Sequence, residues 1–266
     1  LVDAGVDGLF ALGSSGQVAY LTDAERDEVV GRIVARAAGR VPVVVGTADL
    51  TARRVVEQGR RAAEAGASAV VVTAPLYALN DAAEIGRHFR LVADAVGVPV
   101  LAYDVPVRVH AKLGVELLME LARDGVLAGV KDSSGNFDNL LQYLARVPVG
   151  EDFAVLCGND SLILWALLAG ASGSITGVAN VYPETMVGIF DEWSKGEIDR
   201  ARVLQDSIRP FRTVFRHGNP NTVVKLATNM LGWPVGPCRA PFSTLAVEGE
   251  DELRRVLAEG GERDMR

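Results

Sequence analysis

Short apolar segments alternate with longer amphipathic segments along most of this chain. Each apolar segment is a few residues of Val, Leu, Ala or Ile without polar alternation, which is typical of strands buried on both faces of a parallel sheet. The repeat of roughly thirty residues is the length of one strand followed by one helix. The pattern therefore predicts consecutive strand–helix units, with strands at residues 8–13, 41–46, 68–74, 98–104, 126–132, 153–158 and 173–177.

Start and stop signals mark the helices between these strands. Thr22, followed three residues later by Glu25, forms a capping-box pattern ahead of an apolar stripe at residues 29–34. A further helix is predicted over residues 162–168. Glycines just before the following strands fit helix C-terminal caps in the left-handed conformation, namely Gly5, Gly66, Gly97, Gly125 and Gly170.

Seven consecutive units favour a (β/α)8 TIM barrel over a doubly wound sheet. After the last predicted strand come only helices, expected over about 183–195, 197–216, 220–231 and 250–259. Residues 1–182 are expected to hold barrel strands two to eight, and residues 183–266 the last barrel helix and a helical extension, all in one α/β domain. Because residues 1–8 resemble a last helical turn leading into a strand, the first strand and helix are expected to be missing from this chain.

Composition excludes several classes of function. The 266 residues match the length of one barrel, about 250 residues, and 49% hydrophobic residues exclude a disordered chain. A net charge of −7 and a pI of about 5.1 argue against nucleic-acid binding. No apolar run reaches the ~18 residues of a membrane span, so no membrane partner is expected. Two cysteines, Cys157 and Cys238, cannot form a disulfide framework, which favours the cytoplasm.

Residues that close the predicted strands are candidates for chemistry, because barrel active sites lie at the C-terminal ends of strands. Lys131 ends an otherwise apolar run, where an ammonium must be paired or made easier to deprotonate. It could be a nucleophile that forms a Schiff base with a ketone, or it could be ion-paired with Asp132 or Asp160. Tyr103 ends the preceding strand and could shuttle protons beside Lys131, or simply fill the barrel end with its hydroxyl on a carbonyl.

Two further features suit the binding of a carboxylate. The Gly-Ser-Ser-Gly loop at 13–16 offers backbone N–H groups and two hydroxyls, and it matches neither the nucleophile elbow, the P-loop nor the dinucleotide pattern. Arg108 could clamp a carboxylate, or it could be a solvated surface residue. Because the histidines have no paired metal-ligand spacing, we expect no metal at His88, His110 or His217.

Six motifs in order carry a resemblance to a known family. They are G-S-S-G-Q at 13–17, Y-D-V-P-V-R at 103–108, G-V-K-D-S-S-G at 129–135, G-A-S-G-S-I-T-G-V-A-N-V-Y-P at 170–183, N-P-N-T-V-V-K at 219–225 and G-P-C-R-A-P at 236–241. Together they resemble the dihydrodipicolinate synthase / N-acetylneuraminate lyase family of class I pyruvate-dependent aldolases. The resemblance implies a TIM barrel that acts on pyruvate and an aldehyde, needs no metal or organic cofactor, and assembles as a homo-oligomer, a dimer or tetramer.

The resemblance also implies catalytic roles. Lys131 would form the imine with pyruvate, and Tyr103 would shuttle protons during its formation and breakdown. Ser14 stands where the family has the hydroxyl that relays protons to that tyrosine. Tyr77 matches the tyrosine that synthases reach across a subunit interface to complete the relay.

Substrate-binding positions follow from the same resemblance. The backbone of Ser15, beside Gly13, would hold the pyruvate carboxylate. Ile175 and Gly158 would line the pyruvate pocket. Arg108 matches the arginine that grips the carboxylate of the second substrate, aspartate semialdehyde, in true synthases.

Departures from the family pattern concentrate around the second substrate. Leu76 replaces a tyrosine, Asp104 an asparagine, Gln17 a glutamate, and Val109 and His110 a Thr-Gly pair. Retention of Arg108 and of K-D-S-S-G at 131–135 favours 4-hydroxy-tetrahydrodipicolinate synthase activity. A sugar-acid aldolase (an N-acetylneuraminate or 2-keto-3-deoxy acid lyase) and a catalytically silent keto-acid-binding barrel are the alternatives.

The same comparison bears on feedback regulation. Regulated synthases bind lysine through a tyrosine and histidines near the start of the helix after the serine loop, where this chain has Leu76, Asp23 and Arg26. We therefore predict that lysine does not inhibit this protein.

Overall fold

The computed structural model describes residues 1–147 and 152–263, and the contacts within the chain divide it into two compact units. The strand-containing unit spans mainly Val6–Ile175. The helical unit comprises mainly Thr176–Arg266. That the two belong to one domain remains a prediction.

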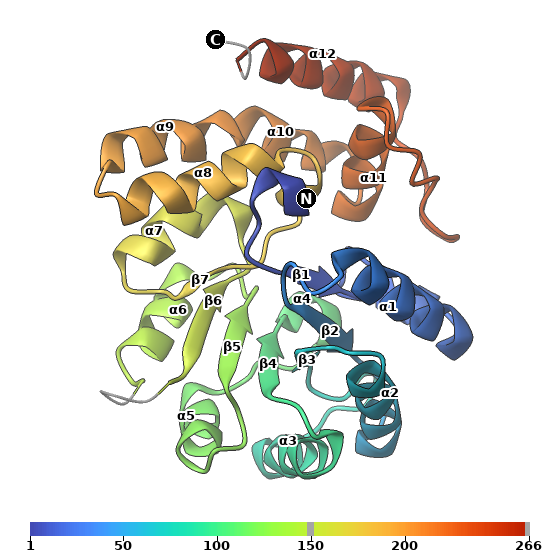
Figure 1. The fold of residues 1–266 in the computed structure, drawn as a ribbon, viewed down its shortest axis with the longest axis vertical. Helices are drawn as coiled ribbons and strands as arrows, with labels where there is room; N and C mark the ends of the chain where they lie inside the picture. Colours follow the sequence, from blue (N-terminus) through green and yellow to red (C-terminus); the bar gives the residue numbers. More distant parts are fainter. Residues whose placement is uncertain (148–151, 264–266) are drawn as a thin grey trace. The chain divides into compact units, whose positions relative to one another are not determined.

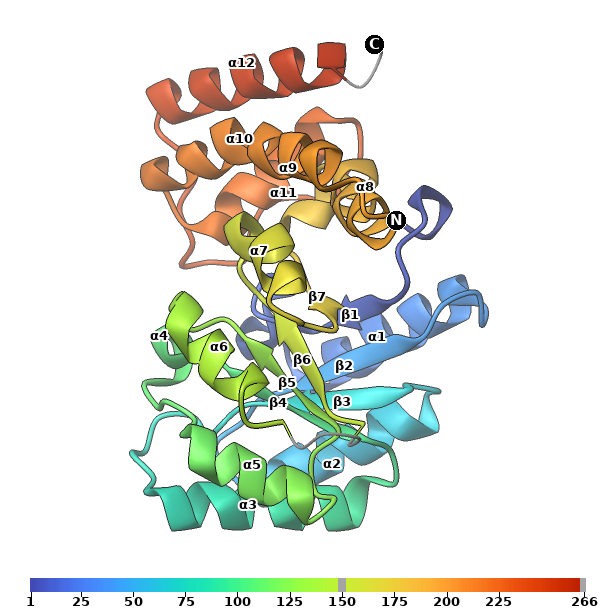
Figure 2. The same ribbon diagram turned by 90° about the vertical axis from the view of Figure 1, so that its left-hand side faces the viewer.

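The strand-containing unit is built on a curled parallel sheet whose strands follow one another in chain order (Figures 1 and 2). Each strand pairs in parallel with the next, as the alternation of apolar and amphipathic segments predicts. Seven strands are present in the described ranges, and each overlaps a predicted apolar run, with β2 ending one residue beyond it: β1 (Leu9–Ala11), β2 (Val43–Thr47), β3 (Ala69–Val72), β4 (Val100–Asp104), β5 (Gly129–Asp132), β6 (Ala154–Cys157) and β7 (Gly173–Ser174).

Helices follow the strands and cover the outer side of the curled sheet (Figure 1). The predicted capping box is confirmed, since the Thr22 hydroxyl accepts a hydrogen bond from the Glu25 N–H and the Glu25 carboxylate accepts one from the Thr22 N–H. The five glycines expected at helix C-termini all have a positive φ. The helices of this unit are α1 (Asp23–Ala37), α2 (Ala52–Glu64), α3 (Ala82–Val96), α4 (Pro106–Val109), α5 (Val115–Arg123), α6 (Phe137–Leu144) and α7 (Ile163–Leu168), with 3-10 turns η2 (Val18–Tyr20) and η3 (Asp160–Leu162).

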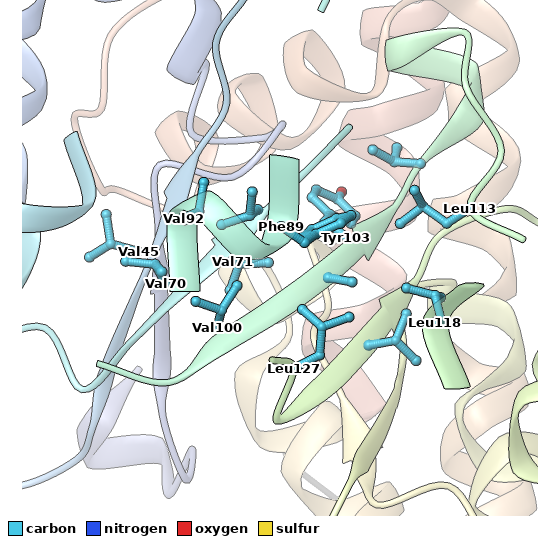
Figure 3. Close-up of a cluster of buried hydrophobic side chains, with 14 of the residues drawn as sticks. Val45, Val70, Val71, Phe89, Val92, Val100, Tyr103, Leu113, Leu118 and Leu127 are labelled. Carbon is cyan, nitrogen blue, oxygen red and sulfur yellow. The ribbon is translucent and has the colours of Figure 1, made fainter. Parts of the chain in front are cut away.

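Apolar side chains of the sheet and of these helices form the core of the unit. Val70 and Val71 of β3 are buried, and so are Phe89 and Val92 of α3 (Figure 3). Tyr103 of β4 lies in the same cluster and brings its hydroxyl group into it (Figure 3). The core therefore holds the ends of the central strands rigidly, which fixes the side chains that the strands present there.

The helical unit consists of α8 (Pro183–Ser194), α9 (Ile198–Ser207), α10 (Arg209–Val214), α11 (Pro220–Met230) and α12 (Val247–Arg263), with 3-10 turns η4 (Val178–Asn180) and η5 (Phe215–His217). Helix α8 packs on α9, and α12 contacts α10 and α11. The prediction of one helix over residues 197–216 is wrong, because α9 ends at Ser207 and a separate helix, α10, begins at Arg209. Pro210 lies in the first turn of α10, and its ring would clash with a carbonyl of the preceding turn in an unbroken helix.

Stability is expected to fall in acid because of His88, which is 4% exposed in α3. Burial lowers the pKa of His88 to about 4, and the backbone of Thr73 offsets only part of that effect. Between the ordinary pKa of 6.5 and about 4 the unfolded chain binds the proton and the folded chain does not. The free energy of unfolding that depends on a neutral His88 is therefore fully present above pH 6.5 and is lost as the pH falls toward 4. It amounts to about 3 kcal/mol.

Urea unfolding between pH 7 and pH 4.5 measures this effect. His88→Leu should flatten the dependence of the unfolding free energy on pH, whereas His110→Asn, at an exposed histidine with a positive φ, should leave it unchanged. An identical pH dependence in wild type and His88→Leu would show that His88 is not the source.

Candidate active site

The ends of β4 and β5 place Lys131 and Tyr103 side by side. The two residues are register partners in the parallel pair, so their side chains project from the same face of the sheet. Each is only 6% exposed. The Lys131 Nζ lies 4.4 Å from the centroid of the Tyr103 ring and 4.6 Å from that of Phe10, which β1 supplies.

Lys131 forms no ion pair with any carboxylate in the described part of the chain, so the pairing with Asp132 or Asp160 that the sequence left open is not observed. Asp132 instead accepts hydrogen bonds from Asn139 Nδ2 at 3.1 Å and from the Ser134 N–H at 2.8 Å. The π-faces of two rings attract the ammonium in place of a counter-ion. An amine held in this way loses no carboxylate partner when it becomes neutral.

The hydroxyl of Tyr103 meets that of Ser14 rather than a backbone carbonyl, with 3.3 Å between the two oxygens. Burial raises the pKa of the Tyr103 phenol, but the positive charge of Lys131 and hydrogen bonds with Ser14 and Ser133 outweigh it and lower the pKa below its usual value. A phenol that ionises more readily beside an amine is suited to giving and taking protons.

The loop after β1 turns sharply to bring Ser14 to this position. Leu12 and Gln17 on either side of it have φ angles of 55° and 56°, in the left-handed region. A Cβ at Gly13 would lie 2.6 Å from Cε1 of Phe10, so only glycine leaves the Phe10 ring in place. Ser15 is exposed on the outer part of this loop.

Gly158, just beyond β6, keeps space open beside the lysine. A Cβ there would stand 3.1 Å from Cε of Lys131 and would overlap the hydroxyl of Ser133. The Gly158 N–H donates to the carbonyl of Asp132 at 2.7 Å, which ties β6 to β5 at this point. Ile175 continues β7, partly buried, with its N–H bound to the carbonyl of Cys157 at 2.9 Å.

Two of the candidate residues are not brought to Lys131. Tyr77 is 97% exposed in the loop after β3 and has a φ of 73°. Arg108 is exposed in α4 and forms no ion pair within the ranges that the structure describes. Both side chains are therefore free to meet a ligand or a second chain.

Sequence reasoning missed Phe10 and Ser133. Phe10 was one apolar residue in a buried run, where no alternation shows which side chain points inward. Ser133 directly follows the Lys131–Asp132 pair, and that adjacency was its only available signal. In the described residues no group of three or more His, Cys, Asp or Glu side chains is arranged to hold a metal ion, and none of the helices is both long and apolar enough to cross a membrane.

Comparisons with known proteins match nearly the whole chain. The sequence model of the Dihydrodipicolinate synthetase family matches residues 1–259. An uncharacterized DapA-like lyase of Halobacterium salinarum is 37% identical over 261 residues, which cover 98% of this chain and 85% of the relative. The 4-hydroxy-tetrahydrodipicolinate synthase of Methanoculleus marisnigri is 34% identical over 262 residues, covering 98% of this chain and 89% of the relative.

A solved structure shows the same arrangement of strands and helices. A prophage protein of the dihydrodipicolinic acid synthase family from E. coli K12, crystallised in complex with pyruvate, superimposes with a TM-score of 0.93 at 30% identity. The match covers 98% of this chain and 89% of that one. The chain therefore belongs to the dihydrodipicolinate synthetase family, a family of lyases and synthases.

Proposed function

We propose that this protein condenses pyruvate with an aldehyde, or cleaves the reverse adduct, through a Schiff base on Lys131. The observation that carries the proposal is a buried amine without a counter-ion in the described ranges, held over the ring of Tyr103, whose hydroxyl meets that of Ser14. The pyruvate complex of the similar E. coli protein supports the choice of keto acid. The seven strands would be seven of the eight in a (β/α)8 barrel.

In the proposed reaction the neutral Lys131 amine attacks the C2 carbonyl of pyruvate. The carbinolamine loses water to give the imine, and loss of a methyl proton gives the enamine. The enamine carbon attacks the aldehyde, and water then releases the product and restores the amine. Tyr103 would donate and accept the protons of these steps, with Ser14 as its relay at 3.3 Å.

The substrates would be held by groups around this pair. The backbone of Ser15, next to Gly13, would bind the pyruvate carboxylate, while Gly158 and Ile175 would bound the pocket. The exposed Tyr77 would complete the proton relay from a second copy of this chain, which implies a homo-oligomer. Tyr77→Phe is the variant that removes only the hydroxyl from this relay.

Aspartate semialdehyde is the acceptor that we propose, which makes the protein a 4-hydroxy-tetrahydrodipicolinate synthase. Several relatives at 33–35% identity carry that name, and the exposed Arg108 would bind the carboxylate of the acceptor. Assays run side by side on aspartate semialdehyde with pyruvate, on N-acetylneuraminate and on 2-keto-3-deoxy sugar acids test the choice. Turnover confined to the sugar acids would contradict it and support the aldolase alternative.

Free lysine is expected not to inhibit this reaction. The guanidinium of Arg26 is buried within 3.3 Å of Asp23 and 3.5 Å of Asp49, and its Nε donates to the carbonyl of Val18. Its position matches one where, by the resemblance, regulated synthases have a lysine-binding histidine, and here the guanidinium is engaged with these carboxylates instead. Initial rates measured across millimolar lysine should stay constant, and micromolar inhibition would contradict the prediction.

A further inference from the structure

Two buried carboxylates end β4 and β5 directly behind the Lys131–Tyr103 pair. Asp104 is fully buried and Asp132 is 4% exposed, and the two are register partners on the opposite face of the sheet from the reacting pair. Asn139 Nδ2 lies 3.3 Å from an oxygen of Asp104 and 3.1 Å from one of Asp132, so one amide group bridges the two carboxylates. Burial raises the pKa of Asp132, and the negative charge of Asp104 adds to that rise.

The carboxylate of Asp104 also binds the far end of the segment that follows it. Lys112 Nζ forms an ion pair with Asp104 Oδ2, and the Leu113 N–H donates to Oδ1 at 3.2 Å. The Tyr143 hydroxyl donates to Oδ2 at 2.8 Å. Lys112 Nζ further donates to the Leu113 carbonyl at 2.6 Å and lies 5.1 Å from the centroid of the Tyr143 ring. One side chain at the end of β4 therefore closes residues 105–113 into a loop.

This loop carries Arg108. The main-chain turn of α4 is formed by hydrogen bonds from the Arg108 N–H to the Val105 carbonyl at 2.9 Å and from the His110 N–H to the Pro106 carbonyl at 2.8 Å. The exposed Arg108 side chain has no ion-pair partner in the described ranges that could fix it independently. The position of its guanidinium thus depends on how the two ends of the loop are held.

We propose that Asp104 and Lys112 are a positioning pair, which fixes the 105–113 loop so that Arg108 meets an acceptor aldehyde bearing a carboxylate. The inference rests on the proposed function and extends it to the residues that set acceptor specificity. The pair acts through Arg108 and does not touch the imine, because its side chains lie on the other face of the sheet from Lys131.

Charge balance gives the proposal a distinctive signature. Lys112→Met leaves the buried Asp104 carboxylate without a cation, which is costly in the folded state and favours opening of the loop to water. In the double variant, Asp104→Asn is added to Lys112→Met. It removes the unpaired charge and keeps a polar group of the same shape for Tyr143 and Leu113. The double variant should therefore be less impaired than Lys112→Met alone.

The test combines kinetics with hydrogen exchange on Lys112→Met, Asp104→Asn and the double variant. Lys195→Met is the matched control, because it removes an exposed lysine whose Nζ lies 2.8 Å from Glu192. Lys112→Met is expected to raise the KM for aspartate semialdehyde by about tenfold or more, with little change in the KM for pyruvate or in borohydride trapping at Lys131. Amides of residues 105–113 should exchange faster in Lys112→Met and recover in the double variant.

Equal rises in both KM values, or a double variant no better than Lys112→Met, would overturn the proposal. So would unchanged exchange in residues 105–113 of Lys112→Met, or a wild-type protein that traps pyruvate but does not turn over aspartate semialdehyde. Failure of the proposed function itself is a separate result, since wild type would then trap no pyruvate at Lys131.

Discussion

Replacement of Lys131 by alanine is expected to lower turnover by on the order of 10³-fold or more and to abolish covalent trapping of pyruvate. The amine is the group that bonds to the keto acid, and no other lysine lies with it beside Phe10 and Tyr103 in the described ranges. The fold should survive, because Lys131 takes part in no ion pair in that part of the chain. Circular dichroism and the thermal midpoint check that point, while a coupled assay measures the rate.

Lys131→Arg provides a matched control for charge. It keeps a buried cation near the two rings, but a guanidinium stays protonated and does not act as the amine nucleophile. We therefore expect it to be as inactive as Lys131→Ala. Condensation that persists in either variant would remove Lys131 from the mechanism.

Tyr103→Phe is expected to lower turnover by roughly 10²-fold to 10³-fold while pyruvate is still trapped on Lys131. The ring that packs edge-on to Phe10, with centroids 6.2 Å apart, remains, and only the hydroxyl bound to Ser14 is lost. Proton transfers should then limit the rate of turnover. The amine can still form the imine, because a trapping experiment lasts much longer than one turnover. Single-turnover kinetics and borohydride trapping measure the two effects separately.

Tyr182→Phe in the helical unit is the control for loss of a tyrosine hydroxyl, and its turnover should match wild type. Near wild-type turnover in Tyr103→Phe would exclude this phenol as the proton shuttle. Loss of trapping together with turnover would instead indicate that the hydroxyl is needed to form the imine at all.

The sequence predicts the strands well because burial on both faces leaves an unbroken apolar run. It also predicts that Lys131 and Tyr103 meet, since both residues come near the end of a strand and neighbouring parallel strands end at the same edge. It does not show that Phe10 points toward Lys131, because an unbroken apolar run hides which side chains face inward. The direction in which a side chain such as Phe10 points can be assigned only when the strand register and the curl of the sheet are known.

The Asp104–Lys112 pair depends on a chain that folds back on itself, and no local pattern encodes that contact. In the sequence Asp104 closes a predicted strand and departs from the family asparagine, but nothing there connects it with the lysine eight residues later. The break between α9 and α10 does not follow from the amphipathic pattern, because that pattern continues past Pro210. The proline ring, however, prevents one continuous helix there.

Reduction with borohydride in the presence of pyruvate, followed by peptide mass analysis, tests the central claim most directly. The chain contains three other lysines, Lys112, Lys195 and Lys225, which serve as internal controls for unspecific modification. We predict one reduced pyruvyl group on the peptide that carries Lys131 and none in Lys131→Ala. Absence of an adduct in wild type, or an adduct on another lysine that persists in Lys131→Ala, would contradict the account and support a barrel that binds keto acids without catalysis.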